Sequence, residues 1–245
     1  VCYASAGKCG DDPNIEDIER QYDFLMAHGG PFNIQLSGGE PTLREDLPEI
    51  IWLGRQKGFT FFQLNTNGIR LAAEPDYAKS LKAAGLNTVF LQFDGMSDAV
   101  YEALRGRPLL REKLAAIESC AAAGLGIVLV PVIAPGVNEE EAGGILRLAM
   151  TRMPYVRGVH FQPLSYFGRC ALKRAERPVT IPRMLRLIEK QTEGMMKYAD
   201  FCGGGAESPY CSFHASYMRR GDGSLRLLGR RGGSCSVSYT HLRAH

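Results

Sequence analysis

The chain has 245 residues, of which 45% are hydrophobic and 22% are charged, and these proportions are typical of a soluble globular protein. The formal net charge is only +3 and the basic residues are scattered, so nucleic acid is not an expected partner. No apolar stretch approaches the roughly 20 residues of a membrane-spanning helix, so no membrane span is expected.

Seven cysteines occur at irregular spacings, in a chain too large to need covalent crosslinks. Their odd number argues against a disulfide framework and favours a reducing, cytoplasmic location. The cysteines are Cys2, Cys9, Cys120, Cys170, Cys202, Cys211 and Cys235.

Apolar stretches alternate with stretches of helical periodicity along most of the chain. The first expected helix has Asp12 as its N-cap and Pro13 at its first position, and the second opens on a capping-box pattern from Thr42 to Glu45. In chain order we expect a helix at 13–28, a strand at 32–36, a helix at 42–58, a strand at 60–65, a helix at 76–84, a strand at 88–93, helices at 98–104 and 109–123, a strand at 126–133, a helix at 139–150, a strand at 156–162 and a helix at 181–198.

This alternation, with short connections, predicts the α/β class with parallel βαβ units. Only five strands precede residue 170, whereas a complete eight-stranded barrel typically needs about 250 residues, all of them in repeats. A partial, open TIM-type barrel is therefore expected over residues 1–170. A hairpin turning at residues 221–223 indicates a small lobe after the last helix, within residues 171–235. Residues 236–245 resemble a translated sequencing adaptor and are expected to be a non-native tail.

Two features near the start of the chain belong together. Gly38-Gly39-Glu40-Pro41 follows the first expected strand, and Cys2 lies about 35 residues upstream. Glycines let backbone carbonyls approach a ligand closely, and Glu40 adds a carboxylate suited to a cationic amino group. An ordinary turn with a capped helix is the alternative for the four residues, and a small buried hydrophobe is the alternative for Cys2.

Together, Cys2 and the GGEP segment resemble the radical SAM superfamily, in which a CxxxCxxC motif precedes GGEP. The resemblance implies a (β/α)6 core whose first strand lies before Val1. It implies a 4Fe-4S cluster held by Cys2 and by two cysteines upstream of residue 1, with S-adenosylmethionine on the open iron. The present chain alone would then be inactive. A weaker resemblance is to the branch that contains tetraether-lipid synthases.

The chemistry implied by this resemblance is reductive cleavage of S-adenosylmethionine to a 5′-deoxyadenosyl radical, which abstracts hydrogen from a substrate. An electron donor such as flavodoxin or ferredoxin is implied as a partner. The substrate, whether a small molecule, a peptide or a lipid, is not specified by the sequence.

Residues at other strand ends are candidates for cofactor binding under the same resemblance. Alternation places Gln92 and Asp94 on one face of their strand, and Gln162 on the same face as His160, which we expect to be structural. Each candidate has an ordinary alternative. These are a simple Asn-Gly turn for Asn67, a cap of the following turn for Asp94, a solvated helix end for Arg105 and core packing for Val132. The candidate set is Gly38, Gly39, Glu40, Pro41, Asn67, Gln92, Asp94, Arg105, Val132 and Gln162.

The C-terminal lobe carries a candidate auxiliary iron-sulfur or metal site made of Cys202, Cys211 and Cys235, with His214 nearby. Their spacing matches no compact metal motif, so ordinary reduced cysteines are the alternative.

Two other functions remain open. A cluster-free barrel lyase or aldolase would need a catalytic lysine or a conventional metal at the strand ends, but Lys57, Lys79 and Lys82 fall on expected helices or loops. A catalytically dead member of the family, acting as a binding module, would lack the upstream cysteines.

Overall fold

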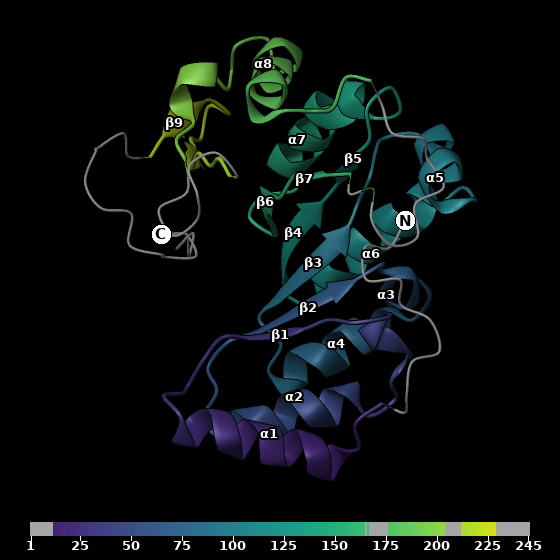
Figure 1. Cartoon of the computed structure of the whole chain (residues 1–245), viewed down its shortest axis with the longest axis vertical. Coiled ribbons are helices and arrows are strands. Elements are labelled where there is room, and N and C mark those ends of the chain that lie inside the picture. Colours follow the sequence, from purple (N-terminus) through teal and green to yellow (C-terminus); the bar gives the residue numbers. More distant parts are fainter. Residues whose placement is uncertain (1–11, 165, 167–175, 204–211, 229–245) are drawn as a thin grey trace.

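The structure is a computed structural model that describes residues 12–164, 166, 176–203 and 212–228 (Figure 1). Its centre is a five-stranded sheet in which every adjacent pair of strands is parallel, in the order β1-β2-β3-β4-β6. Neighbouring strands follow one another along the chain, which confirms the predicted succession of βαβ units in an open arrangement. The strands are β1 (Ile34–Leu36), β2 (Phe62–Thr66), β3 (Thr88–Gln92), β4 (Gly126–Val130) and β6 (Val156–Val159).

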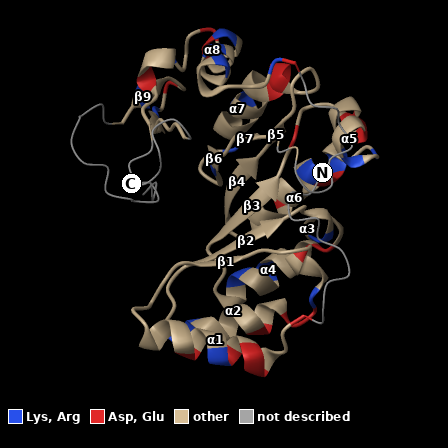
Figure 2. Ribbon diagram, in the orientation of Figure 1, with Lys and Arg blue, Asp and Glu red and all other residues tan. Residues whose placement is uncertain are grey.

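Helices connect the strands and pack in one layer against the sheet (Figure 1). Contacts join α1 to α2, α2 to α4, and α4 and α3 to α6, so the layer is continuous. Strands β1 to β4 carry no charged residue, whereas the helices around them do (Figure 2). The helices of this layer are α1 (Ile15–Ala27), α2 (Leu47–Gln56), α3 (Ile69–Ala73), α4 (Pro75–Ala84), α6 (Leu110–Ala122) and α7 (Ala142–Thr151), while α5 (Asp98–Arg105) packs in a separate cluster with Ala134 and Leu164.

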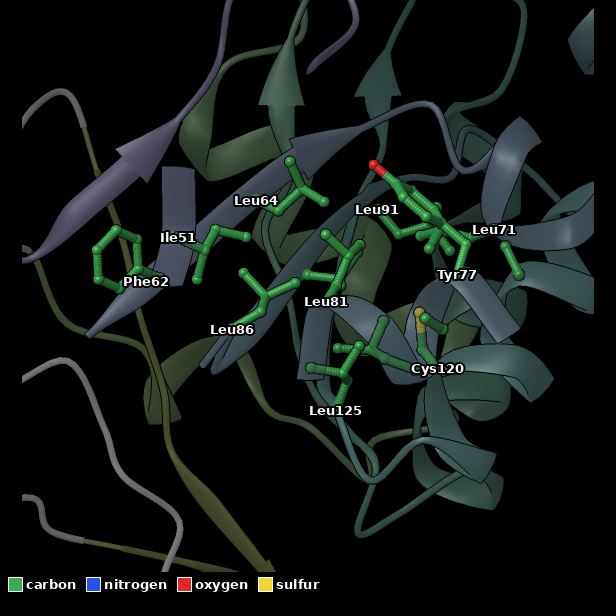
Figure 3. Close-up of a cluster of buried hydrophobic side chains, with 14 of the residues drawn as sticks. Ile51, Phe62, Leu64, Leu71, Tyr77, Leu81, Leu86, Leu91, Cys120 and Leu125 are labelled. Carbon is green, nitrogen blue, oxygen red and sulfur yellow. The ribbon is translucent and has the colours of Figure 1, made fainter. Parts of the chain in front are cut away.

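The main hydrophobic core lies between the sheet and these helices. Successive residues of a strand point to opposite faces, and Leu64 and Leu91 on the helix side are fully buried. They join Leu81 of α4 and Cys120 of α6 in one cluster (Figure 3). Each buried Leu contributes roughly 1.5–3 kcal/mol to stability, so this face fixes the register of the strands. The opposite face carries both polar and apolar side chains, among them Gln63, Asn65, Phe90 and Val128.

Two helix starts differ from the prediction. The N-cap of α1 is Asn14, whose Oδ1 accepts a hydrogen bond from Asp17 N at 2.8 Å, so the predicted cap at Asp12 was wrong. The segment Pro41–Leu43 forms a separate 3-10 turn, η1, and α2 begins only after Asp46. Thr42 therefore does not cap α2, and the predicted capping box was wrong.

A second, two-stranded parallel sheet extends beyond the main one and pairs β5 (Val132–Ile133) with β7 (Gln162–Pro163). The single strand predicted at 126–133 is divided because Pro131 has no N–H to donate. The single strand predicted at 156–162 is divided as well, between β6 and β7.

The last described elements are a helix and a hairpin that follow the main sheet in the chain. Helix α8 (Ile181–Gln191) packs on α7, and β8 (Tyr217–Arg219) pairs with β9 (Leu225–Leu227) in an antiparallel hairpin. The prediction of this hairpin is confirmed. The helix predicted to reach residue 198 ends at Gln191, since Glu193 and Gly194 have φ angles of 54° and 76°. None of the helices in the described ranges is both long and apolar enough to cross a membrane.

Candidate functional site

A cavity of about 710 Å³ lies on the face of the sheet opposite the hydrophobic core. Its walls are formed by residues of every strand of the main sheet, on the face that points away from the helices, and by the loop after β1. One row runs straight across the sheet, because Asn65, Phe90, Val128 and Gly158 are in register on adjacent strands. The sequence predicted such a site at the strand ends, and the structure places most of the predicted residues around this one cavity.

The loop after β1 opens onto the cavity through two glycines. Gly38 and Gly39 have φ angles of 107° and 46°, in the left-handed region that other residues rarely adopt. A Cβ added at either position would meet no atom within 4 Å, so both adjoin open space. The loop thus presents bare backbone to a ligand.

Glu40 holds this loop against the turn after β2. Its Oε1 accepts hydrogen bonds from the hydroxyls of Thr42 at 2.7 Å and Thr66 at 2.6 Å, and its Oε2 accepts one from the backbone N–H of Asn67 at 2.7 Å. A carboxylate that accepts several hydrogen bonds is held firmly in one orientation. The side chain of Glu40 therefore shapes the site, although it also lines the cavity.

Asp94, at the end of β3, is fully buried and pairs with Arg105 of α5. Arg105 Nε donates to Asp94 Oδ2 at 2.8 Å and Arg105 Nη2 donates to Asp94 Oδ1 at 3.0 Å. Oδ1 also accepts the backbone N–H of Val132 at 3.1 Å. Neither Asp94 nor Arg105 lines the cavity, so the structure places both of these predicted residues behind it, where they join α5 to β3 and β5.

Asn138 braces the same region from the loop after β5. Its Nδ2 donates to the carbonyl oxygens of Asp94 at 2.7 Å and Val132 at 2.8 Å, while its Oδ1 accepts the N–H of Ala134. This fully satisfied amide explains why Asn138 is only 1% exposed. Its side chain makes no cap hydrogen bond to η2 (Glu139–Glu141).

Asn67 and Gln92 line the cavity and share a buried partner, Lys113 of α6. Lys113 Nζ donates to the carbonyl oxygen of Asn67 at 2.5 Å and to Gln92 Oε1 at 3.3 Å. Burial disfavours the charged form and lowers the pKa of Lys113 to about 8. The Asn67 side chain caps the next turn, since its Oδ1 accepts the N–H of Ile69 at 2.8 Å.

His160 and Gln162 lie at the far side of the cavity, on one face as predicted. The His160 ring centroid is 6.4 Å from that of Phe90. Val132 also lines this side.

The predicted metal ligands are only partly within the described residues. Cys2, Cys211 and Cys235 lie outside them. Cys202 is exposed, and its Sγ lies 3.2 Å from Nε2 of His214 across an antiparallel bridge. In the described parts of the chain, no three His, Cys, Asp or Glu residues come together as a metal site.

Sequence reasoning missed several residues of this site. The inward residues recur with a period of two along each strand, as in Gln35 and Ser37, or Gln63 and Asn65, and that signal was available. Lys113 was missed although it lies three and four positions before the buried Ala116 and Ile117, on the apolar stripe of α6. A charged residue on such a stripe is a recognisable anomaly.

A family model described as the Radical SAM superfamily matches residues 1–149. Among curated proteins, 7,8-dihydro-6-hydroxymethylpterin dimethyltransferase of Methanocaldococcus jannaschii is 46% identical over 206 residues, covering 82% of this chain and 40% of that protein. GTP 3′,8-cyclase of Paenarthrobacter nicotinovorans is 36% identical over 154 residues, covering 62% of this chain and 42% of the cyclase. The chain thus spans less than half the length of these relatives.

Solved structures share the fold at low sequence identity. SuiB of Streptococcus suis superposes with a TM-score of 0.59 at 14% identity, over 78% of this chain and 42% of that one. Methylornithine synthase superposes with a TM-score of 0.54 at 16% identity, over 73% of this chain and 53% of that one. Both agree with the open arrangement of parallel strands described above.

Proposed function

We propose that the chain forms the core of an enzyme that cleaves S-adenosylmethionine reductively at a 4Fe-4S cluster. The chain belongs to the radical SAM superfamily, and the relatives described above are enzymes. When bound, the cluster and S-adenosylmethionine supply an electron and a carbon-centred radical that removes hydrogen from a substrate. The observation that carries this proposal is the Glu40 network, which fixes two strand-end turns around one cavity.

The cavity residues suit S-adenosylmethionine in size and chemistry. A volume of about 710 Å³ lies within the usual range for small-molecule sites, about 300–1,000 Å³. The bare backbone of Gly38 and Gly39 suits the amino group of the ligand, and the apolar surface near Val132 suits a flat base. Gln92 and Gln162 add polar groups for the ribose or the carboxylate. Pro41 fixes the turn after Glu40.

The cluster would be held by Cys2 together with two cysteines preceding Val1. The cluster would then need an external electron donor, such as flavodoxin or ferredoxin, in a reducing, cytoplasmic compartment. The protein's own contribution is to orient the ligand and to exclude water from the cavity.

For the substrate, we propose a fused bicyclic nitrogen heterocycle of the reduced pterin type. Two curated relatives are named for compounds that contain a fused bicyclic nitrogen heterocycle, a dihydropterin and the purine nucleotide GTP. The cavity floor supports this class because Gln35, Gln63 and Asn65 present neutral amides beside the Phe90 ring. Amides match the alternating donors and acceptors of these heterocycles, and an aromatic ring offers a stacking face.

The test uses the full-length protein, reconstituted anaerobically with iron and sulfide and then reduced. With S-adenosylmethionine and 7,8-dihydro-6-hydroxymethylpterin, we expect 5′-deoxyadenosine and a pterin product of increased mass. Release of 5′-deoxyadenosine without change to any pterin tested would refute the substrate class alone. Absence of 5′-deoxyadenosine would refute the proposed chemistry.

An auxiliary cluster in the C-terminal lobe is a second proposal, with Cys202, Cys211 and Cys235 as ligands. The 3.2 Å contact between Cys202 Sγ and His214 Nε2 favours it, because thiolate and imidazole are both common metal ligands. The cluster-free lyase remains without support: Lys57 pairs with Glu19 and Asp23, and Lys79 with Asp76, all away from the cavity.

A further inference from the structure

Lys113 is a fully buried cation that the proposed chemistry does not use. Its side chain comes from α6 and reaches the carboxyl ends of β2 and β3. Within the described residues it has no carboxylate at ion-pair distance, and its partners are the carbonyl oxygen of Asn67 and the amide oxygen of Gln92. Lys113 itself does not line the cavity, whereas both of its partners do.

The two neighbours of Gln92 fix the orientation of its amide. Its Oε1 accepts from Lys113, and its Nε2 donates to Asp94 Oδ2 at 2.7 Å. An ammonium only donates and an ionised carboxylate only accepts, so a flipped amide would oppose like groups at both ends. Asp94 is itself held by Arg105. The amide of Gln92 is therefore locked in one of its two orientations.

The locked amide has one N–H left, because Nε2 carries two and only one reaches Asp94. Gln92 is the last residue of β3 and lines the cavity, so this second N–H is available to a ligand that binds there. An unlocked amide would present its oxygen about as often as its nitrogen and would lose affinity for an acceptor.

We propose that Lys113 is a positioning residue, which locks Gln92 as a hydrogen-bond donor to an acceptor group of S-adenosylmethionine. This inference rests on the proposed function, in which the cavity binds S-adenosylmethionine. A purely structural role explains the residue poorly. A Leu or Met would continue the apolar stripe of α6 without the cost of burying a charge.

The charged groups around Lys113 come from several elements. Asp94 and Glu40 favour its ammonium form, and Arg105 and Arg107 oppose it. The ring of Tyr101 in α5 lies 6.0 Å from Nζ. Burial outweighs these charges, so a fraction of Lys113 becomes neutral slightly above neutral pH. A neutral amine accepts as well as donates, and the lock then weakens.

The experiment is a double-mutant cycle on S-adenosylmethionine binding to the full-length, cluster-loaded protein without reductant, measured by anaerobic calorimetry. Lys113→Met and Gln92→Leu are each expected to weaken binding about tenfold, with iron content and thermal midpoint monitored. The double variant should bind no more weakly than the worse single variant, because both changes remove one shared interaction. Losses that multiply, or wild-type affinity in Lys113→Met, would overturn the inference.

Gln92→Glu adds a sharper control, since it keeps an acceptor for Lys113 but removes the donor to the ligand. It should weaken binding at least as much as Gln92→Leu; wild-type affinity in Gln92→Glu would also overturn the inference. Failure of the wild-type protein to bind S-adenosylmethionine would instead reject the proposed function.

If Lys113→Met does not fold, the wild-type pH profile decides the matter. We divide the affinity of the wild-type protein for S-adenosylmethionine by that of Gln92→Leu at each pH. This ratio should fall as the pH rises through about 8, the pKa of Lys113. The amino group of the ligand titrates in both proteins, so its effect cancels in this ratio. A ratio that stays constant from pH 7 to pH 9 would contradict the role of Lys113.

Discussion

Glu40 and Thr66 join two strand ends: the Thr66 hydroxyl at the end of β2 donates to Oε1 of Glu40, beyond the end of β1, at 2.6 Å. The same hydroxyl accepts the N–H of Gly68 at 3.0 Å. The double-glycine loop and the turn after β2 therefore behave as one unit. A single carboxylate sets the shape of the cavity mouth.

Replacing this carboxylate by an amide should damage the mouth of the cavity. In Glu40→Gln, one oxygen becomes a donor and faces hydroxyl and N–H groups that already donate. We expect a loss of roughly 1–3 kcal/mol in unfolding free energy and at least about tenfold weaker binding of S-adenosylmethionine. Urea denaturation and calorimetry measure both.

Glu45→Gln is the matched control, because Glu45 is 82% exposed and pairs with Arg70 on the surface. A surface pair contributes about 0–1 kcal/mol, so Glu45→Gln should change little. Equal effects in the two variants would contradict the role given to Glu40.

Asp94→Asn should be among the most destabilising single changes in the core. It leaves the Arg105 guanidinium without its buried counter-charge, and breaking a buried pair in this way costs about 3–5 kcal/mol. Asp76→Asn is the control, since Asp76 and Lys79 are 91% and 64% exposed. Chemical denaturation of both variants tests this, and a loss below about 1 kcal/mol for Asp94→Asn would refute the structural account of the pair.

The stability of the protein should depend on pH through Lys113. Burial lowers the pKa of Lys113 to about 8 in the folded state, from the ordinary lysine value of 10.5, so the unfolded state binds more protons between these values. Stability contributed by this group therefore rises with pH from about 8 to 10.5, by roughly 3 kcal/mol in total.

Subtracting the Lys113→Met profile isolates this effect from other titrating groups. Urea denaturation at a series of pH values gives both curves. Parallel curves for the wild type and Lys113→Met would mean that Lys113 is not desolvated as described.

The proposed auxiliary cluster predicts a change in iron content. Cys202→Ser should lower the iron and sulfide bound per chain, and His214→Ala should change the absorption or resonance spectrum of the cluster. Cys120→Ala is the control, because Cys120 is buried in the apolar core and burial raises its pKa to about 12. Equal iron in Cys202→Ser and the wild type would reject Cys202 as a ligand.

The alternation of strands and helices was predictable because apolar periodicity is set by burial against the sheet. Element ends were less predictable, since they depend on tertiary partners. Asn138 illustrates this: an Asn just before a helical turn is a common N-cap, but its Oδ1 accepts the N–H of Ala134 instead of an N–H of η2. Its Nδ2 donates to the distant carbonyl of Asp94, and such a contact is invisible in a local window of sequence.

The candidate site was predictable at its motif and less so around it. The double-glycine loop stood out because GGEP follows a strand and resembles a family motif, and the structure adds that both glycines adopt left-handed φ angles. Asp94 and Arg105 were placed at the right strand end, but only the structure reveals that they neutralise one another behind the cavity. Lys113 reaches Asn67 across 46 positions of sequence, and no local pattern specifies that contact.

The most direct test of the central claim compares Cys2→Ala with Cys9→Ala in the full-length protein, each reconstituted anaerobically and reduced with S-adenosylmethionine present. The amount of 5′-deoxyadenosine released per chain is measured. We predict that Cys2→Ala abolishes release while Cys9→Ala retains it at the wild-type level. Undiminished release from Cys2→Ala would contradict the assignment of Cys2 to the cluster.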